Sequence, residues 1–346
     1  MLLPETYFAA LLLMVLSAFC WGSWANTFKM TGNWRFELYY YDFAFGVLFA
    51  AVIAAFTFGT WPSGEGLEFL DDLTHGGKRQ MVLTVLSGGI FNLGNMLFLG
   101  AISIAGLSVA YPIGGVTALL VATVFSFIMR PQGNAPLLFS GLAILVASMV
   151  AGSLAYRSRE LRKLEERIKS GKAKSTLKRV SLKGVYVSVA AGVFMGAHAP
   201  LIGAAGSGDS AMGIYSIGFL FALGVCASAF VLNLFLMNLP LAGPPVEILE
   251  YFRAGWKRHI LGWLGGVILF TGWIAALLSQ TPPERATQLG PAISFSLRHS
   301  AVVLAAFWGF LLWKEYAGTD IRAKSLVLLM LVLFLTGLVL VAVVPL

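Results

Sequence analysis

Long apolar runs separated by short polar joints make up most of this chain. Ten of these runs reach the roughly 20 residues that an α-helix needs to cross a bilayer. They are residues 7–26, 38–59, 81–104, 106–129, 136–156, 184–205, 213–239, 259–280, 290–313 and 325–345. Because unpaired backbone groups are costly in lipid, each run is expected to form a helix. The pattern therefore predicts an all-α, polytopic membrane protein with ten transmembrane helices.

One joint is much longer than the others. Residues 157–183 hold eleven Lys and Arg side chains and divide the runs into two groups of five. We therefore expect a first five-helix repeat at 1–156, a basic linker at 157–183 and a second five-helix repeat at 184–346. An odd number of crossings in each repeat inverts the second repeat relative to the first. Many secondary transporters have this construction and bind their solute between the repeats, near the middle of the membrane.

Positive charge predicts the orientation of the chain. Nineteen of the 24 Lys and Arg residues lie in the linker or in joints on its side, whereas four lie on the opposite side. Positively charged loops stay cytoplasmic, so we expect a cytoplasmic linker, both termini outside, and the cell (inner) membrane as the location. The net charge of +8 then reflects topology and indicates no nucleic-acid partner. A linker helix that rests on anionic lipid is the alternative to a solvated one.

The composition excludes several classes of protein. Hydrophobic residues make up 58% of the chain and mean hydropathy is +0.83, which rules out an ordinary soluble domain. Cys20 and Cys226 both fall in apolar runs and have no disulfide or metal-site spacing. A Walker A loop, a metal-binding cluster and a catalytic motif are all lacking. We therefore expect no cofactor, no metal and no enzyme; the pattern does not indicate an oligomeric state.

Polar side chains inside the runs are candidates for solute binding, because lipid disfavours them. Trp21 and Trp24 share a face that can stack on a flat ring or a sugar; an interfacial aromatic belt is the alternative. Asn92 and Asn95 share a face in the third run and offer amide donors and acceptors, with a helix–helix hydrogen bond as the alternative. Four further candidates for binding the solute are Tyr111, Thr271, Trp273 and Ser294.

The ninth run carries an arginine beside a histidine. Arg298 follows Pro291 by seven residues, which places it about 10 Å along the helix at a rise of 1.5 Å per residue. A buried guanidinium stays charged and needs acceptors. We expect Arg298 to hold a substrate oxygen; bonding to backbone carbonyls is the alternative. His299 lies about 100° round the helix, although both side chains can border one cavity.

Three residues are candidates for carrying a coupling proton. His198, two residues before Pro200, and His299 have side chains that titrate near physiological pH. Asp42 is the only carboxylate inside the predicted spans. It follows three tyrosines at the start of the second run, where an exposed position at the end of a loop is the alternative.

Ten spans divided five and five by a basic linker resemble the drug/metabolite transporter superfamily, and several short motifs add to the resemblance. The stretch FWGFLLWKEY (307–316) is similar to the close of the penultimate span in that superfamily. Three stretches are similar to plant-type ureide permeases: CWGSW (20–24), YYYDFAFGVLFAAVIAAFTFG (39–59) and YSIGFLFALGVCASAFVLNLFLM (215–237). LGNMLFLGAISIAGLSVAYPIGG (93–115) resembles those permeases and also the L-rhamnose/proton symporter and glucose/ribose porter branches.

The resemblance implies proton-coupled uptake of a small, uncharged polar solute. The ureide branch implies a ureide or nucleobase such as allantoin or uracil, and the sugar branches imply a monosaccharide. Two further hypotheses stay open, namely export of a metabolite or drug and a membrane scaffold or sensor that transports nothing. The chain departs from the plant permeases in its central loop, which is short and basic and has no phosphate-loop-like motif.

Overall fold

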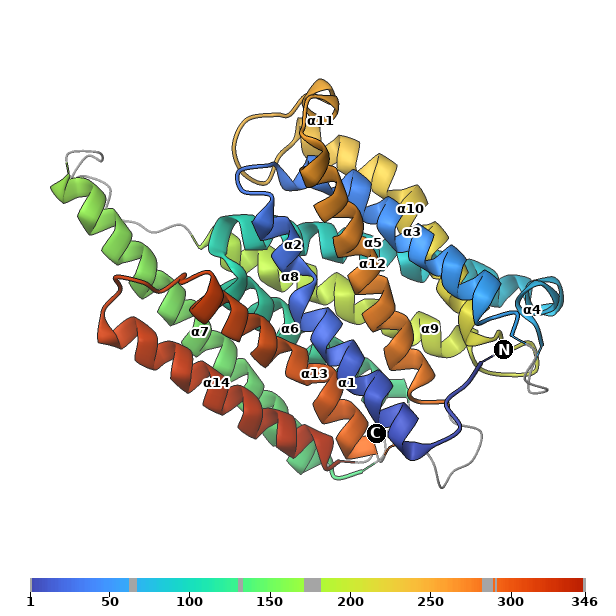
Figure 1. The fold of residues 1–346 in the computed structure, drawn as a ribbon. Coiled ribbons are helices and arrows are strands. Elements are labelled where there is room, and N and C mark those ends of the chain that lie inside the picture. Colours follow the sequence, from blue (N-terminus) through green and yellow to red (C-terminus); the bar gives the residue numbers. More distant parts are fainter. Residues whose placement is uncertain are drawn as a thin grey trace.

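The computed structural model describes residues 2–61, 67–129, 133–170, 182–281, 289 and 291–344, and across these ranges its regular secondary structure is helical (Figure 1). Ten stretches are long and apolar enough to cross a membrane. They are Tyr7–Met30, Phe36–Thr57, Lys78–Ala105, Leu107–Met129, Ala135–Lys169, Lys183–Ala205, Ile214–Asn238, Trp256–Leu278, Ile293–Leu312 and Ile321–Ala342. The prediction of an all-α membrane protein with ten transmembrane helices is confirmed.

Some of these spans consist of two consecutive helices. The elements are α1 (Tyr7–Ser23), α2 (Ala25–Met30), α3 (Phe36–Thr57), α4 (Phe69–His75), α5 (Lys78–Ala105), α6 (Leu107–Met129), α7 (Ala135–Lys169), α8 (Lys183–Ala197), α9 (Ala199–Ala205), α10 (Ile214–Asn238), α11 (Leu249–Phe252), α12 (Trp256–Leu278), α13 (Pro291–Phe307), the π-helix η2 (Trp308–Leu312) and α14 (Ile321–Ala342). The joint between α8 and α9 falls at His198, just before Pro200. There the His198 carbonyl accepts a hydrogen bond from the Ser87 hydroxyl at 3.1 Å.

The fourth predicted run matches its helix, whereas the fifth is much longer than predicted. Pro112 lies inside a continuous α6, which keeps the predicted extent of the fourth run. The fifth span continues well past residue 156, since α7 runs to Lys169 and projects beyond its neighbours (Figure 1). Arg162 pairs with Glu166 one turn on, which supports this exposed extension. Residues 171–181 of the predicted linker lie outside the described residues.

Helices of the two halves pack in matching pairs. Suppose that each span of the first half is equivalent to the span five places later. The contact between α5 and α8 then corresponds to the contact between α12 and α1, and the contact between α6 and α8 corresponds to that between α13 and α1. The pairs α3–α12 and α5–α10 correspond in the same way, and α7 packs on α14. This is the packing that two equivalent five-helix repeats require. The inversion of the second repeat stays a prediction.

Glycines allow two of these matched crossings to be close. A Cβ on Gly88 of α5 would lie 3.1 Å from the Cα of Gly224 on α10. At the α3–α12 crossing, a Cβ on Gly266 would lie 3.0 Å from the carbonyl carbon of Gly46. Both crossings therefore place backbone against backbone, which a larger side chain would prevent.

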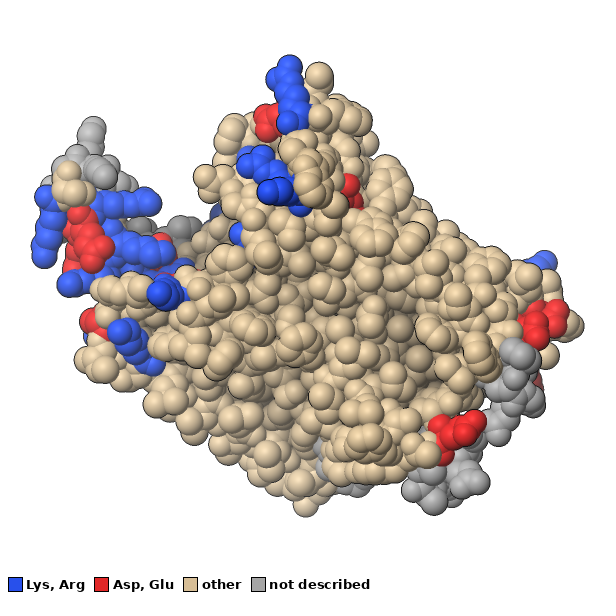
Figure 2. All heavy atoms as spheres, in the orientation of Figure 1, with Lys and Arg blue, Asp and Glu red and all other residues tan. Residues whose placement is uncertain are grey.

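The outer surface is that of a membrane protein. Val231 is 71% exposed and Leu328 is 65% exposed, and exposed apolar side chains of this kind recur over the bundle, as the lipid environment allows. We call the end where α7 finishes and α8 begins the linker face, and the end where α1 begins and α14 finishes the terminal face. Lys and Arg gather at the linker face (Figure 2), in keeping with the charge asymmetry of the sequence.

Candidate functional site

A cavity of about 370 Å³ lies among helices of both halves. Its lining comes from α1, α5, α6, α8, α9, α12 and α13 and is mostly apolar or glycine. The lining side chains that can form hydrogen bonds are Trp21, Tyr111, His198, Trp273, Gln280, Arg298 and His299. Exposed lining residues such as Gly203 and Gln280 lie at or just past helix ends at the terminal face. The cavity is therefore placed to communicate with that face.

Aromatic side chains form its walls and are held by other rings. Trp273 stacks on Phe221 with ring centroids 4.2 Å apart and planes 11° apart. Phe98 meets Tyr111 edge to face at 5.0 Å, and the Tyr111 hydroxyl donates a hydrogen bond to the Trp21 carbonyl. Rings fixed in this way present flat faces and a few polar edges, an arrangement that suits a planar ligand.

The guanidinium of Arg298 lines this cavity without a protein acceptor. Its Nε atom is buried, and no hydrogen bond or ion pair joins the side chain to another residue within the described ranges. The alternative in which Arg298 bonds backbone carbonyls is therefore wrong for this part of the chain. A buried donor such as this Nε is costly without a partner, so Arg298 gives the cavity a charged donor that is available to a ligand oxygen.

Two imidazoles border the same space from different helices. The Nδ1 atom of His198 faces the Met195 carbonyl, and Nδ1 of His299 lies 2.8 Å from the Phe295 carbonyl. A carbonyl can only accept, so these contacts assign the proton of each neutral ring to Nδ1 and leave Nε2 as the acceptor. Although Arg298 and His299 point apart on α13, they meet the same cavity.

The two predicted asparagines face neighbouring helices instead of the cavity. Both are fully buried. Asn92 accepts a hydrogen bond from the Tyr40 hydroxyl at 2.7 Å and donates to Ser228 at 2.9 Å, while Asn95 donates to Tyr40 at 3.1 Å. These contacts join α3, α5 and α10, so the helix–helix alternative describes the asparagines.

Three other candidates for binding substrate also lie away from the cavity lining. Trp24 is fully buried behind the wall and packs on Phe43 and Phe98. The Thr271 hydroxyl donates to the Val267 carbonyl of its own helix at 2.8 Å, and Ser294 is absent from the lining. Thr271 and Ser294 share a helix with a lining residue but face elsewhere.

Asp42 belongs to a separate cluster near the linker face. It accepts a hydrogen bond from Tyr251 at 2.6 Å and lies 2.8 Å from Nδ1 of His259. It is buried and not an exposed residue at a loop end. It is also not the only carboxylate in a span, because α3 begins at Phe36 and so includes Glu37, which is fully buried and pairs with Arg35.

Sequence reasoning missed Gln280 and the apolar lining residues. Gln280 follows Trp273 by seven residues, the spacing that returns to the same helix face, so this signal was present. A second signal was the run of small residues on α6, where Gly115, Ala118 and Ala122 repeat at helical spacing after Tyr111. Small side chains on one face leave room for a cavity.

Comparisons with known proteins find similarity to ureide permeases. The family model for ureide permeases matches residues 39–181. Ureide permease 4 and Ureide permease 1 of Arabidopsis thaliana are each 22% identical to this chain over 97% of both proteins. The chain is ureide permease-like. This ureide permease-like chain is consequently a transporter with a small-molecule substrate and not an enzyme, as the sequence predicted.

A solved structure shares the fold. It is described as "Crystal structure of protein"; its TM-score to this chain is 0.55, its sequence identity is 14%, and the match covers 96% of both chains. At this identity the likeness concerns the fold alone. It supports the arrangement of helices around the cavity of this ureide permease-like chain.

Proposed function

We propose that this chain carries a ureide or nucleobase, such as allantoin or uracil, and binds it in the 370 Å³ cavity. One observation carries the proposal: the Arg298 guanidinium lines the cavity and has no acceptor among the described residues. Ureides and oxo-heterocycles present carbonyl oxygens that accept from two N–H groups of a guanidinium at once. The names of the relatives, which are ureide permeases, support the same class of solute.

The other lining groups complement such a solute. The rings of Trp21 and Trp273 offer faces on which a flat heterocycle stacks. The Nε2 atoms of His198 and His299 can accept the ring N–H groups that a ureide carries next to its carbonyls. Gln280 adds an amide at the exposed rim. The set pairs acceptors with donors without needing a charge on the solute.

Transport in this proposal is uptake coupled to protons. His198 and His299 are the imidazoles that line the cavity, the side-chain type whose unperturbed pKa lies closest to physiological pH, and we assign the coupling proton to one of them. With the linker cytoplasmic in the cell (inner) membrane, the terminal face is outside, so the cavity receives solute from outside. The repeats 1–156 and 184–346 then move relative to each other to present the site to the inside.

Transport by purified protein in proteoliposomes tests the proposal. Labelled allantoin, uracil, rhamnose and glucose are offered in parallel with and without an imposed inward proton gradient. We expect allantoin or uracil to accumulate, faster with the gradient, and the unlabelled compound to compete. Accumulation of a sugar alone would assign the chain to the monosaccharide alternative. If none of the four compounds accumulates or competes, the proposal is wrong.

A further inference from the structure

A second cavity of about 680 Å³ lies at the linker face. It is lined by segments of four spans together with residues 32–35, Gly106, residues 242–244 and Glu315. Basic side chains are prominent in this lining: Lys29, Arg35, Arg159 and Lys163. It shares α5 with the first cavity, includes residues of α2, which continues α1, and reaches Gly106 just before α6.

The two cavities follow one another along the same helices. On α5, Phe98 lines the first and Ile102 the second, which are about 6 Å apart at 1.5 Å per residue. On α6 and the residue before it, Tyr111 lines the first and Gly106 the second, about 7.5 Å apart. The barrier between the cavities is therefore about one to two helical turns thick.

The first layer of this barrier is aromatic. Trp24 is fully buried and its ring centroid lies 6.5 Å from that of Phe98. Phe98 packs edge to face on Tyr111, whose hydroxyl bonds the Trp21 carbonyl. This layer closes the first cavity on the side of the linker face.

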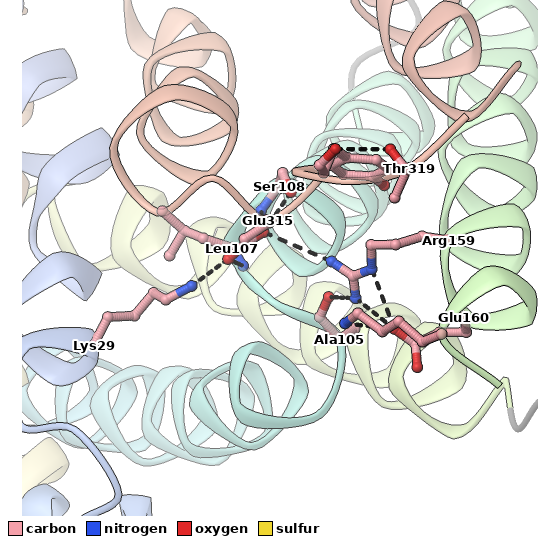
Figure 3. A network of polar contacts seen from close by, with 10 residues as sticks. Lys29, Ala105, Leu107, Ser108, Arg159, Glu160, Glu315 and Thr319 are labelled. Atoms are coloured by element: carbon pink, nitrogen blue, oxygen red, sulfur yellow. Dashed lines mark hydrogen bonds and ion pairs between the residues drawn. The ribbon is translucent and has the colours of Figure 1, made fainter. Parts of the chain in front are cut away.

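The second layer is polar and is centred on Glu315 (Figure 3). The carboxylate accepts the backbone N–H groups of Leu107 at 2.8 Å and Ser108 at 2.9 Å. It also accepts the Ser108 hydroxyl and pairs with the Lys29 ammonium. Only 7% of the Glu315 side chain is exposed. A single carboxylate thus links α2, the first turn of α6 and the segment after η2, and its charge suits the N-terminus of α6.

The surrounding backbone is shaped to seat this carboxylate. Lys314 has φ 47°, a left-handed conformation that costs energy for a residue with a side chain. Gly106 has φ 88°, and a Cβ there would lie 2.7 Å from Oε2 of Glu315. A Cβ on Gly309 in η2 would lie 2.6 Å from the Ser108 nitrogen. Strain and close approach at three positions indicate that the contact is specific.

Further hydrogen bonds join the end of α1 and the start of α2 to η2 and the residue after it. The Trp308 indole donates to the Ser23 hydroxyl at 3.0 Å and the Trp313 indole to the Asn26 amide oxygen at 2.6 Å. On the other side, Arg159 of α7 lies 4.0 Å from the Glu315 carboxylate and bonds the Ala105 carbonyl. All of these contacts lie between the first cavity and the linker face.

We propose that the second cavity is the linker-side half of the substrate path. In this conformation Glu315, held by Lys29 and the start of α6, is the gate that closes the path between the two cavities. The inference rests on the proposed transport function. A solute leaving the first cavity along α5 and α6 has to separate the start of α6 from the end of the ninth span. Breaking the Glu315 contacts is the step that joins the two cavities.

Thiol labelling of purified protein in detergent tests the gate without any substrate. The two buried cysteines, Cys20 and Cys226, are first replaced by alanine. One reporter is then introduced, either Ile102→Cys in the second cavity or Ala118→Cys in the first. The labelling rate by a small hydrophilic maleimide is compared for Glu315 and Glu315→Gln. The control is Glu166→Gln, which removes a carboxylate of an exposed pair on α7.

We expect Glu315→Gln to raise the labelling rate of Ile102→Cys about fivefold or more and to lower that of Ala118→Cys, whereas the control changes neither. Ile102 is 3% exposed, so its reporter is slow while the gate is closed. If Glu315→Gln yields no folded protein, Lys29→Met carries the same test, because it removes the ion pair and keeps the contacts to α6. Unchanged labelling in a folded variant overturns the gate. Absence of ureide uptake by the unmodified chain would overturn the proposed function and leave this result standing.

Discussion

Replacing Arg298 with methionine should change stability and binding in opposite directions. Methionine keeps most of the length of the side chain and removes the charge. In the substrate-free protein the guanidinium lines the cavity with a buried Nε that has no partner. An unsatisfied buried donor costs about 1–3 kcal/mol, so Arg298→Met should stabilise the substrate-free protein by about 2 kcal/mol.

The same change should weaken substrate binding strongly. Two hydrogen bonds from a charged donor at about 1.5 kcal/mol each amount to about 3 kcal/mol, or roughly a 100-fold increase in Kd. Thermal unfolding measures both effects in one experiment. At a ligand concentration of about 100 times the Kd of the unmodified protein, binding adds about 2.7 kcal/mol of stability, and Arg298→Met should lose nearly all of this gain.

A matched variant separates this effect from the loss of any arginine. Arg162→Met removes an arginine that is 47% exposed on α7 and pairs with Glu166, and it should leave both quantities nearly unchanged. The reasoning fails if Arg298→Met lowers the stability of the substrate-free protein by about 2 kcal/mol or more, since Arg298 would then be structural. It also fails if the variant keeps the ligand-induced shift.

Three further predictions concern the walls, the buried network and the gate. Trp273→Ala removes a stacking face of the cavity and should raise the Kd for allantoin or uracil about tenfold, from a stacking contribution of about 1–3 kcal/mol, measured by titration of purified protein. Asn92→Ala removes the hydrogen bonds to Tyr40 and Ser228. It should lower the free energy of unfolding by about 1–2 kcal/mol and leave the Kd for the solute unchanged. A large loss of affinity in the folded variant would show instead that Asn92 contacts the substrate. Burial raises the pKa of Glu315, but the Lys29 charge and the hydrogen bonds from Lys29 and Ser108 outweigh it, so the pKa is lowered. A carboxylate with a lowered folded pKa stabilises above its unfolded pKa of about 4.3 and loses this contribution as pH falls through the folded value. The stability difference between the unmodified protein and Glu315→Gln should therefore be constant from about pH 7 to pH 5 and shrink below about pH 4.3 in melting curves, and a difference that already declines between pH 7 and 6 would contradict the assignment.

Several features could be predicted from local sequence. The ten spans depend only on whether a run of about 20 residues is apolar, so their number was predictable while their ends shifted, as for Glu37 and α7. Arg298 and His299 were recognisable as a candidate site because a charged side chain inside a span has few stable positions. Trp21, Tyr111, His198 and Trp273 joined them in the cavity.

Partners remote in sequence decided the rest. Asn92 and Arg298 are both polar residues within apolar runs, and nothing local distinguishes them. Asn92 meets Tyr40, 52 residues away, and Ser228, 136 residues away, whereas Arg298 meets no acceptor in the described ranges. Whether a polar side chain is satisfied by protein or left for a ligand depends on which helices cross beside it.

The sequence by itself determined the class of protein, the spans and the asymmetry of charge, because transfer into lipid and the placement of positive loops are properties of each segment. Only the tertiary structure decided which polar groups face a cavity and which close it. Glu315 lies outside the apolar runs that marked candidates, and its partners Lys29 and Ser108 are 286 and 207 residues away. Its role follows from packing that brings three distant backbone segments around one carboxylate.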